Sequence, residues 1–221
     1  MKIDFNNAAL EILRQTKENN IISHEENLGW DVLEHFGLSR DSERRIIVDR
    51  EKRISIAMAV VGKGADIAEV IGLLTWKDFE GLIANIMSEN GFRCTESFRR
   101  RGDSSVRGME IDVIGIHERS VFSVDAKMWG IRGGKSSALR GAAVKQKERT
   151  VQLLAQREKL SEKLQPVVSG EYEFFPILVT WMVEDVELHE GVPVVPVFKF
   201  NTFILDFDTY RDLVVSYTDR L

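Results

Sequence analysis

The sequence predicts an α/β protein in which a mixed central sheet is flanked by helices, preceded by a small all-α N-terminal domain. Three observations predict this class. Residues 1–72 show the helical spacing of apolar residues and no alternating strand pattern. Residues 73–221 read in the order helix, three strands, helix, strand. Glycine and proline, with 16 and 4 residues among 221, are too few for a fibrous repeat or a disordered chain.

Four helical segments make up the expected N-terminal domain, 1–72. They span residues 8–20, 26–37, 42–62 and 65–74. The last two could form a helix-turn-helix, but the would-be recognition helix carries Asp66 and Glu69 and neither lysine nor arginine. A packing or dimerising role is therefore favoured over base recognition, and we expect a homodimer.

Capping residues mark the first helix of the second domain, 73–221. Thr75 is a typical N-cap for a helix over residues 76–90, with Asp78 at its third position, and Gly91 is a typical helix end. The later elements follow from alternating or helical apolar patterns. They are strands over 92–98, 109–116 and 121–129, a long helix over 136–164, and strands over 175–182 and 195–200.

The composition excludes several classes of protein. A chain with 43% hydrophobic and 29% charged residues is typical of a globular protein. No uncharged run approaches the roughly 18 residues of a membrane helix, and the first residues lack the apolar core of a signal peptide. We therefore expect a cytoplasmic protein. The single cysteine, Cys94, excludes an internal disulfide and a thiolate metal cluster.

Charge is distributed unevenly along the chain. The formal net charge is -5, yet residues 93–163 hold 16 Lys and Arg against 9 Asp and Glu. The remaining residues hold 14 against 26. A basic central surface between acidic flanks suits a protein that approaches phosphates, although a solvated helix face would give the same count.

The register of one predicted hairpin brings two aspartates together. The polar segment His117-Glu-Arg-Ser reads as the turn, which pairs Ile116 with Val121. Counting back from that pair puts Asp112 opposite Asp125, with both side chains on one face of the sheet. Like charges about 5 Å apart destabilise a sheet, by roughly 3 kcal/mol when partly buried. A divalent cation would offset that repulsion.

The same face carries the groups that phosphodiester chemistry requires. Mg²⁺ takes one or two carboxylates, which Asp112 and Asp125 supply, and leaves positions for water and a substrate phosphate. Lys127 lies two residues beyond Asp125 and therefore on the same face, where it can stabilise developing charge. Glu110 is expected opposite Lys127, either as its ion-pair partner or to tune it. A solvated hairpin face is the alternative to a metal site.

A carboxylate followed by Asp-x-Lys on the next strand, after a helix that carries a Glu, resembles the PD-(D/E)xK nuclease superfamily. The segments DFEGLIANIMSENGF, EIDVIG and VDAKMW are similar to Mrr-like restriction endonucleases and archaeal Holliday-junction-resolvase-like proteins. The similarity covers about residues 75–182. Ile111 stands where the superfamily name has Pro, and Asp125 is Asp rather than Glu.

This resemblance implies a restriction-endonuclease-like core and a Mg²⁺- or Mn²⁺-dependent endonuclease that hydrolyses DNA phosphodiester bonds, of restriction type or on branched DNA. It implies metal binding by Asp112, Asp125 and the backbone carbonyl of Ala126. Lys127 would be the catalytic lysine, and Glu80 an auxiliary acid near the metal, with an ordinary surface glutamate as the alternative.

Basic and polar residues around the hairpin are candidates for contacts with the nucleic-acid backbone. They are Arg99, Arg100, Arg101, Arg132, Lys135, Arg140, Lys145, Gln146 and Arg149. The segment WGIRGGKSS nearly imitates a nucleotide-binding P-loop, but Trp129 stands where the first glycine belongs. A catalytically inactive DNA-binding module or regulatory subunit that retains the fold is the alternative to an enzyme.

Overall fold

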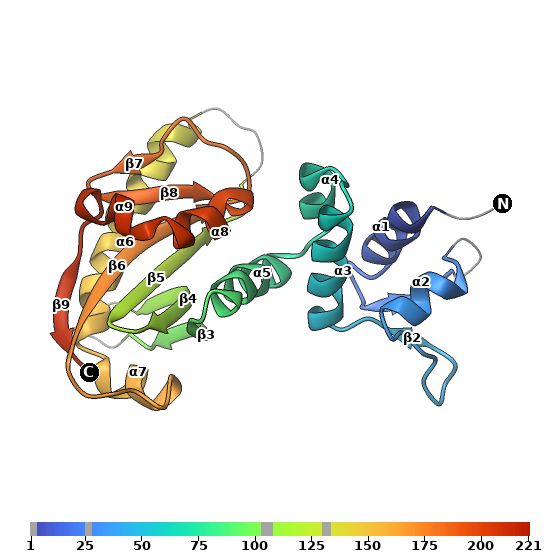
Figure 1. The fold of residues 1–221 in the computed structure, drawn as a ribbon, viewed down its shortest axis with the longest axis horizontal. Helices are drawn as coiled ribbons and strands as arrows, with labels where there is room; N and C mark the ends of the chain where they lie inside the picture. Colours follow the sequence, from blue (N-terminus) through green and yellow to red (C-terminus); the bar gives the residue numbers. More distant parts are fainter. Residues whose placement is uncertain (1–3, 25–27, 103–107, 130–133) are drawn as a thin grey trace. The chain divides into compact units, whose positions relative to one another are not determined.

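A computed structural model describes residues 4–24, 28–102, 108–129 and 134–221 (Figure 1). The chain divides into two compact units, residues 1–82 and 83–221. The division lies inside helix α5 (Trp76–Glu89), later than the boundary expected near residue 72. Within the described residues, no helix is both long enough and apolar enough to cross a membrane.

The first unit contains the four expected helices in shortened form, together with two short strands and the beginning of α5. Its elements are α1 (Phe5–Gln15), β1 (Ile21–Ile22), α2 (Trp30–His35), β2 (Ile46–Ile47), α3 (Arg50–Gly62) and α4 (Ile67–Gly72). Apolar side chains from all four helices form one buried core. The mainly helical character of this unit was therefore predictable from apolar spacing.

The expectation of an all-α N-terminal domain is wrong, because β1 and β2 pair as a small antiparallel sheet. Residues 42–49 were expected to continue the helix now seen as α3. Instead, the Asp49 side chain caps α3 by accepting from the Lys52 amide at 2.8 Å, so the helix begins at Arg50. Asp41 and Arg45 close a turn before β2, with both backbone and side-chain hydrogen bonds of 2.8 Å.

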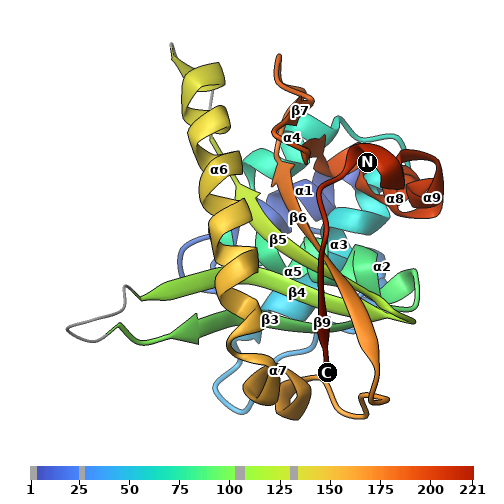
Figure 2. The same ribbon diagram turned by 90° about the vertical axis from the view of Figure 1, so that its left-hand side faces the viewer.

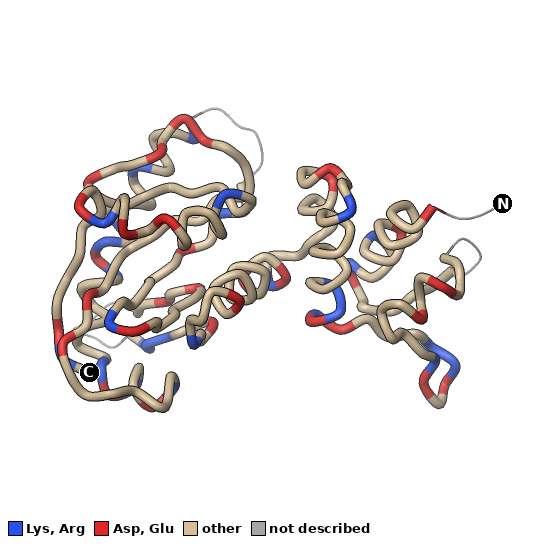
Figure 3. The backbone as a smooth tube through the Cα atoms, viewed as in Figure 1, with Lys and Arg blue, Asp and Glu red and all other residues tan. Residues whose placement is uncertain are grey.

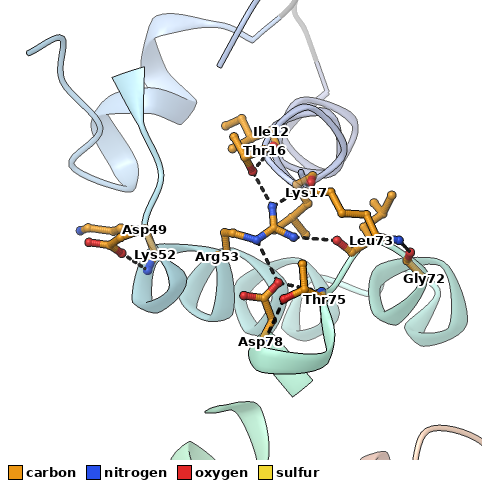
Figure 4. Close-up of polar contacts among 11 residues, drawn as sticks. Ile12, Thr16, Lys17, Asp49, Lys52, Arg53, Gly72, Leu73, Thr75 and Asp78 are labelled. Carbon is orange, nitrogen blue, oxygen red and sulfur yellow. Dashed lines mark hydrogen bonds and ion pairs between the residues drawn. The ribbon is translucent and has the colours of Figure 1, made fainter. Parts of the chain in front are cut away.

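A buried arginine holds the helices of the first unit together (Figure 4). Arg53 on α3 is 1% exposed and donates to Asp78 Oδ2 at 3.0 Å. Its other nitrogens donate to the Leu13 carbonyl at 2.9 Å, to Thr16 Oγ1 at 2.5 Å and to the Leu73 carbonyl at 2.7 Å. One guanidinium therefore ties α1, α3 and the loop between α4 and α5, and satisfies a charge that would otherwise be costly to bury.

The predicted caps of α5 are confirmed. The Asp78 amide donates to Thr75 Oγ1 at 3.1 Å, while the Thr75 amide donates to Asp78 Oδ2 at 2.8 Å, which is a reciprocal capping box. At the other end, Gly91 adopts a φ of +81°, and the Phe92 amide donates to the Met87 carbonyl at 3.1 Å.

The second unit is built on a seven-stranded mixed sheet, so the α/β class is confirmed. The strands are β3 (Arg93–Arg100), β4 (Met109–His117), β5 (Ser120–Lys127), β6 (Glu171–Thr180), β7 (Leu188–His189), β8 (Val192–Pro196) and β9 (Tyr217–Arg220). The order is β3-β4-β5-β6-β8-β7, with β9 also paired to β6. Strand β4 pairs antiparallel with β3 and with β5, whereas β6 pairs in parallel with β5 and with β8.

Helices cover both faces of this sheet. They are α6 (Lys135–Leu154), α7 (Arg157–Lys163), α8 (Val197–Leu205), α9 (Phe207–Tyr210) and a 3-10 turn (Arg211–Leu213). Figure 2 shows α6 crossing one face. On the opposite face, the ring of Phe207 lies 4.6 Å from that of Phe122 and 4.9 Å from that of Phe175. The hairpin of β4 and β5 is therefore buried on both sides.

Two predicted elements of this unit are wrong in detail. The long helix expected over 136–164 is two helices, because the backbone leaves helical geometry at Gln156, with φ −116° and ψ 20°. The break lets Leu160 on α7 join the core beside Leu153 of α6. The last expected strand, 195–200, is mostly the helix α8. Pro196 ends β8 and is the N-cap residue of that helix.

Charges of both signs occur on each unit, as the blue and red positions in Figure 3 show. The excess of Lys and Arg over residues 93–163 therefore does not make either unit basic throughout (Figure 3). The fold of the second unit determines which of these cations lie close together.

Candidate functional site

The register of the β4–β5 hairpin is confirmed up to the aspartates. Ile116 pairs with Val121, as expected, and the last residues in register are Val113 and Val124. Asp112 and Asp125 come next, where the backbone pairing of the two strands has ended. The register between β3 and β4 is the same on both sides of Asp112, from Glu96–Val113 to Phe98–Ile111, and Ser97 between them has a φ of +50°. The β4–β5 hairpin is therefore open from the aspartates onward.

The Asp112 side chain bridges the opened strands. This residue is 8% exposed, and its Oδ2 atom accepts a hydrogen bond of 2.8 Å from the backbone amide of Ala126. At the end of the β4–β5 ladder, the Asp112 carboxylate thus serves as the hydrogen-bond acceptor for a backbone amide of β5. The alternative of a solvated hairpin face does not hold, because Asp112 and Asp125 are both buried.

Two cations of the protein surround the Asp125 carboxylate, which is 2% exposed. Its Oδ1 atom accepts from Arg149 Nη1 of α6 at 2.6 Å. Its Oδ2 atom forms an ion pair with Lys127 Nζ, although within the described part of the chain no hydrogen bond of good geometry reaches that atom. The repulsion between the aspartates, which we expected a divalent ion to offset, is therefore already offset by Arg149 and Lys127.

The lysine of the site is held from two sides. The Lys127 side chain is 16% exposed, and Nζ lies 5.7 Å from the centroid of the Trp129 ring as well as against Asp125. The expected pairing of Lys127 with Glu110 is wrong. Glu110 instead accepts from Arg99 of β3. Its Oε1 atom lies 2.7 Å from Arg99 Nη2 and 2.8 Å from Arg99 Nε.

The residues of the hairpin fit a magnesium-type site. Mg²⁺ uses one or two carboxylates and keeps several waters, so Asp112, Asp125 and a backbone oxygen such as that of Ala126 would suffice. The buried Oδ2 atom of Asp125, which accepts no well-formed hydrogen bond from a described residue, is a suitable ligand atom. Among the described residues there is no group of three or more His, Cys, Asp or Glu that could hold a metal ion, so the site would depend on the two aspartates together with water and backbone oxygens.

Glu80 lies on α5 within the first unit and is not an ordinary surface glutamate. It is 1% exposed, and its Oε2 atom lies 2.6 Å from Lys77 Nζ. A buried carboxylate on a helix needs such compensation. Its expected role as an auxiliary acid near the metal stays a prediction.

A groove of about 420 Å³ on the second unit gathers many of the predicted phosphate-binding residues. Its side chains come from the ends of β3 and β4 and from one face of α6. It is lined by Arg99, Arg100, Arg101, Gly108, Met109, Glu110, Lys145, Glu148, Arg149 and Gln152. Five cations thus face two carboxylates, and Arg149 connects the groove to Asp125.

Other predicted contact residues lie elsewhere. Lys135 is paired with Glu184 at 2.6 Å and donates to the Trp129 carbonyl at 3.0 Å. Gln146 is fully buried and donates to the Ser123 carbonyl at 2.7 Å, which fastens α6 to β5. Arg140 is exposed on α6, and Arg132 lies outside the described residues.

Sequence reasoning grouped Arg149 with the phosphate contacts but missed its contact with Asp125. The available signal was the helical spacing that puts Arg149 one turn from Lys145 on a helix following the hairpin. Glu184, the partner of Lys135, was missed altogether, because no local pattern joins positions 49 residues apart.

No family model matches the chain, and no curated protein matches it. Among solved structures, the chain is similar to protein VC1899 from Vibrio cholerae, with a TM-score of 0.38 and 11% sequence identity. The match covers 95% of this chain and 50% of that chain, so this chain spans half the length of VC1899. A functional proposal therefore depends on the geometry of the site itself.

Proposed function

We propose that this chain is a Mg²⁺- or Mn²⁺-dependent endonuclease that hydrolyses phosphodiester bonds of DNA, on a restriction-endonuclease-like core. One observation carries the proposal. Two buried aspartates and Lys127 lie together at the opened end of a hairpin, and Arg149 links them to a groove lined by cations. Burial of so much charge is costly and is typical of a functional site.

The aspartates would hold the ion, with the Ala126 carbonyl as a further ligand. A divalent cation supplies a Lewis acid that polarises the phosphodiester and lowers the pKa of a water molecule. Asp112 is already oriented by the Ala126 amide, so its carboxylate needs little reorganisation to act as a ligand.

Lys127 would stabilise negative charge as the reaction proceeds. In hydrolysis, the water molecule gives up a proton as its oxygen bonds to phosphorus, the bond from phosphorus to the leaving sugar oxygen breaks, and that oxygen takes up a proton. The ammonium group, which contacts Asp125 and lies near the Trp129 ring, would act on the attacking oxygen or on the phosphate.

The groove would bind the DNA backbone. Guanidinium and ammonium groups contact phosphates without reading the base sequence. Arg101 and Lys145, which both line the groove, would each neutralise a phosphate, while Arg149 would hold the backbone near the aspartates. Homodimer formation, which would present two sites to two strands, and a cytoplasmic location belong to the same proposal.

A second candidate is a DNA-binding module without catalysis. The observation that favours it is the charge balance around Asp125, where Lys127 and Arg149 together leave no negative charge to neutralise. Such a site is stable without a metal. The groove would then bind DNA in the same way, but no product would form.

Cleavage assays on the full chain distinguish the two candidates. Wild type, Asp125→Asn and Lys127→Met are incubated with linear, branched and methylated DNA in Mg²⁺, Mn²⁺ or EDTA. The enzyme proposal predicts that wild type forms products only when Mg²⁺ or Mn²⁺ is present. Neither variant should form products, although both should still bind DNA. Intact DNA in every wild-type sample, with unchanged binding by Asp125→Asn, would support the inactive module instead.

A further inference from the structure

The two cations on Asp125 differ in their freedom to leave it. Lys127 follows on the same strand, is 16% exposed and is packed near Trp129. Arg149 comes from α6, is 34% exposed and lines the groove. When a divalent cation binds to this carboxylate, the two neighbouring cations are no longer both required to balance its charge. Arg149 is the more exposed of the two and is therefore the one that can be released.

The groove offers Arg149 an alternative anion. Its contact with Asp125 uses one terminal nitrogen, Nη1. A guanidinium presents five donors in a planar fork that matches the oxygens of a phosphate group. Lys145, one helical turn away on α6, and Arg101 also line the groove and make the same space attractive to a phosphodiester.

We infer that Arg149 is an exchangeable countercharge for Asp125. It occupies the carboxylate while metal and nucleic acid are absent, and turns to a backbone phosphate in the groove when a divalent cation binds to Asp125. This inference rests on the proposed function and adds to it a coupling between the metal and the nucleic acid. Arg149 is in this sense a positioning residue, since it acts through Asp125 and through the position of the phosphate.

Coupling of this kind is reciprocal. If the metal releases Arg149 to the groove, bound nucleic acid must raise the affinity for the metal by the same factor. Because the pair between Arg149 and Asp125 is partly exposed, we expect a factor of about three to ten. Removal of Arg149 should give that gain in metal affinity without any nucleic acid.

The test measures Mn²⁺ binding by the full chain from the electron paramagnetic resonance signal of free Mn²⁺. It is carried out with and without a short phosphorothioate duplex, which keeps its charge and resists hydrolysis, and Mn²⁺ bound by the duplex alone is subtracted. Arg149→Met keeps an unbranched stem without charge. Lys147→Met is the matched control, because Lys147 lies on the same helix and is paired with a carboxylate, Glu190, at 2.9 Å outside the groove. Arg149→Lys keeps the charge and loses the fork.

Without duplex, Arg149→Met should bind Mn²⁺ about three to ten times more tightly than wild type, and Lys147→Met should match wild type. With duplex, wild type and Lys147→Met should gain Mn²⁺ affinity and Arg149→Met should not, while Arg149→Lys should lie between. Wild-type binding of Mn²⁺ with no gain in Arg149→Met would overturn the countercharge and leave the proposed function intact. No Mn²⁺ binding by wild type under either condition would overturn both.

Discussion

The carboxylate of Asp112 and the backbone amide of Ala126 are joined by a hydrogen bond of 2.8 Å where β4 and β5 cease to pair. The bond gives Asp112 a structural role that is separable from metal binding. Asp112→Ala should lower the free energy of unfolding by about 1–3 kcal/mol, because the buried amide loses its acceptor. Asp112→Asn keeps an acceptor oxygen and should cost less. Urea unfolding of both variants measures the difference, and equal stabilities would refute this role.

Arg53 is expected to dominate the stability of the first unit. Arg53→Met leaves the Asp78 carboxylate buried without its cation, which should cost about 3–5 kcal/mol. Arg45→Met is the control, because the ion pair of Arg45 with Asp41 lies at the surface and should contribute little to stability. Urea unfolding followed by circular dichroism would show the contrast. Similar losses from both variants would mean that the buried network contributes little.

Cys94 gives a pH-dependent prediction. Burial raises the pKa of its thiol to about 11, from an ordinary value of 9.0. Between those values the unfolded chain loses the thiol proton and the folded protein keeps it, so the contribution of Cys94 to stability falls as pH rises. At pH near 10 wild type should lose about 1 kcal/mol relative to its stability near pH 8, and Cys94→Ala should lack this component.

Urea unfolding of wild type and Cys94→Ala at the two pH values isolates the thiol, because all other titrating groups are shared. The native thiol should also react slowly with iodoacetamide near pH 8 and rapidly in urea. An identical pH response in the two proteins, with fast labelling of the native chain, would rule out the raised pKa.

The groove predicts the salt dependence of DNA binding. Arg101→Met and Lys145→Met should each reduce the slope of log Kobs against log salt by about 0.9, because each removes one phosphate contact. Lys147→Met should leave the slope unchanged, since Lys147 is paired with Glu190 at 2.9 Å outside that groove. Fluorescence anisotropy at several salt concentrations provides the slopes. Equal slopes for all four proteins would place DNA binding elsewhere.

Local patterns predicted the parts of the fold that local forces decide. The pairing of Ile116 with Val121 follows from the turn beside it, and the helix α5 follows from Thr75, Asp78 and Gly91 at its ends. The class of the second unit likewise follows from strand and helix periods. Each of these features depends on residues a few positions apart.

The features that could not be predicted depend on distant residues. Two-residue strands such as β1 and β2 carry no readable alternation, so β1 was not predicted and the residues of β2 were taken for helix. The contact between Arg149 and Asp125 spans 24 positions, and Arg53 meets Asp78 across 25. Sequence periodicity indicates that such residues are near a buried face, but the partner is chosen by tertiary packing.

The most direct test of the account is anomalous diffraction from crystals of the full chain soaked in Mn²⁺. The account predicts a peak between Asp112 and Asp125, in contact with both carboxylates, with Asp125 no longer bound to Arg149. The absence of a peak there, with Asp125 still held by Lys127 and Arg149 and the Asp112 oxygens turned away, would contradict it.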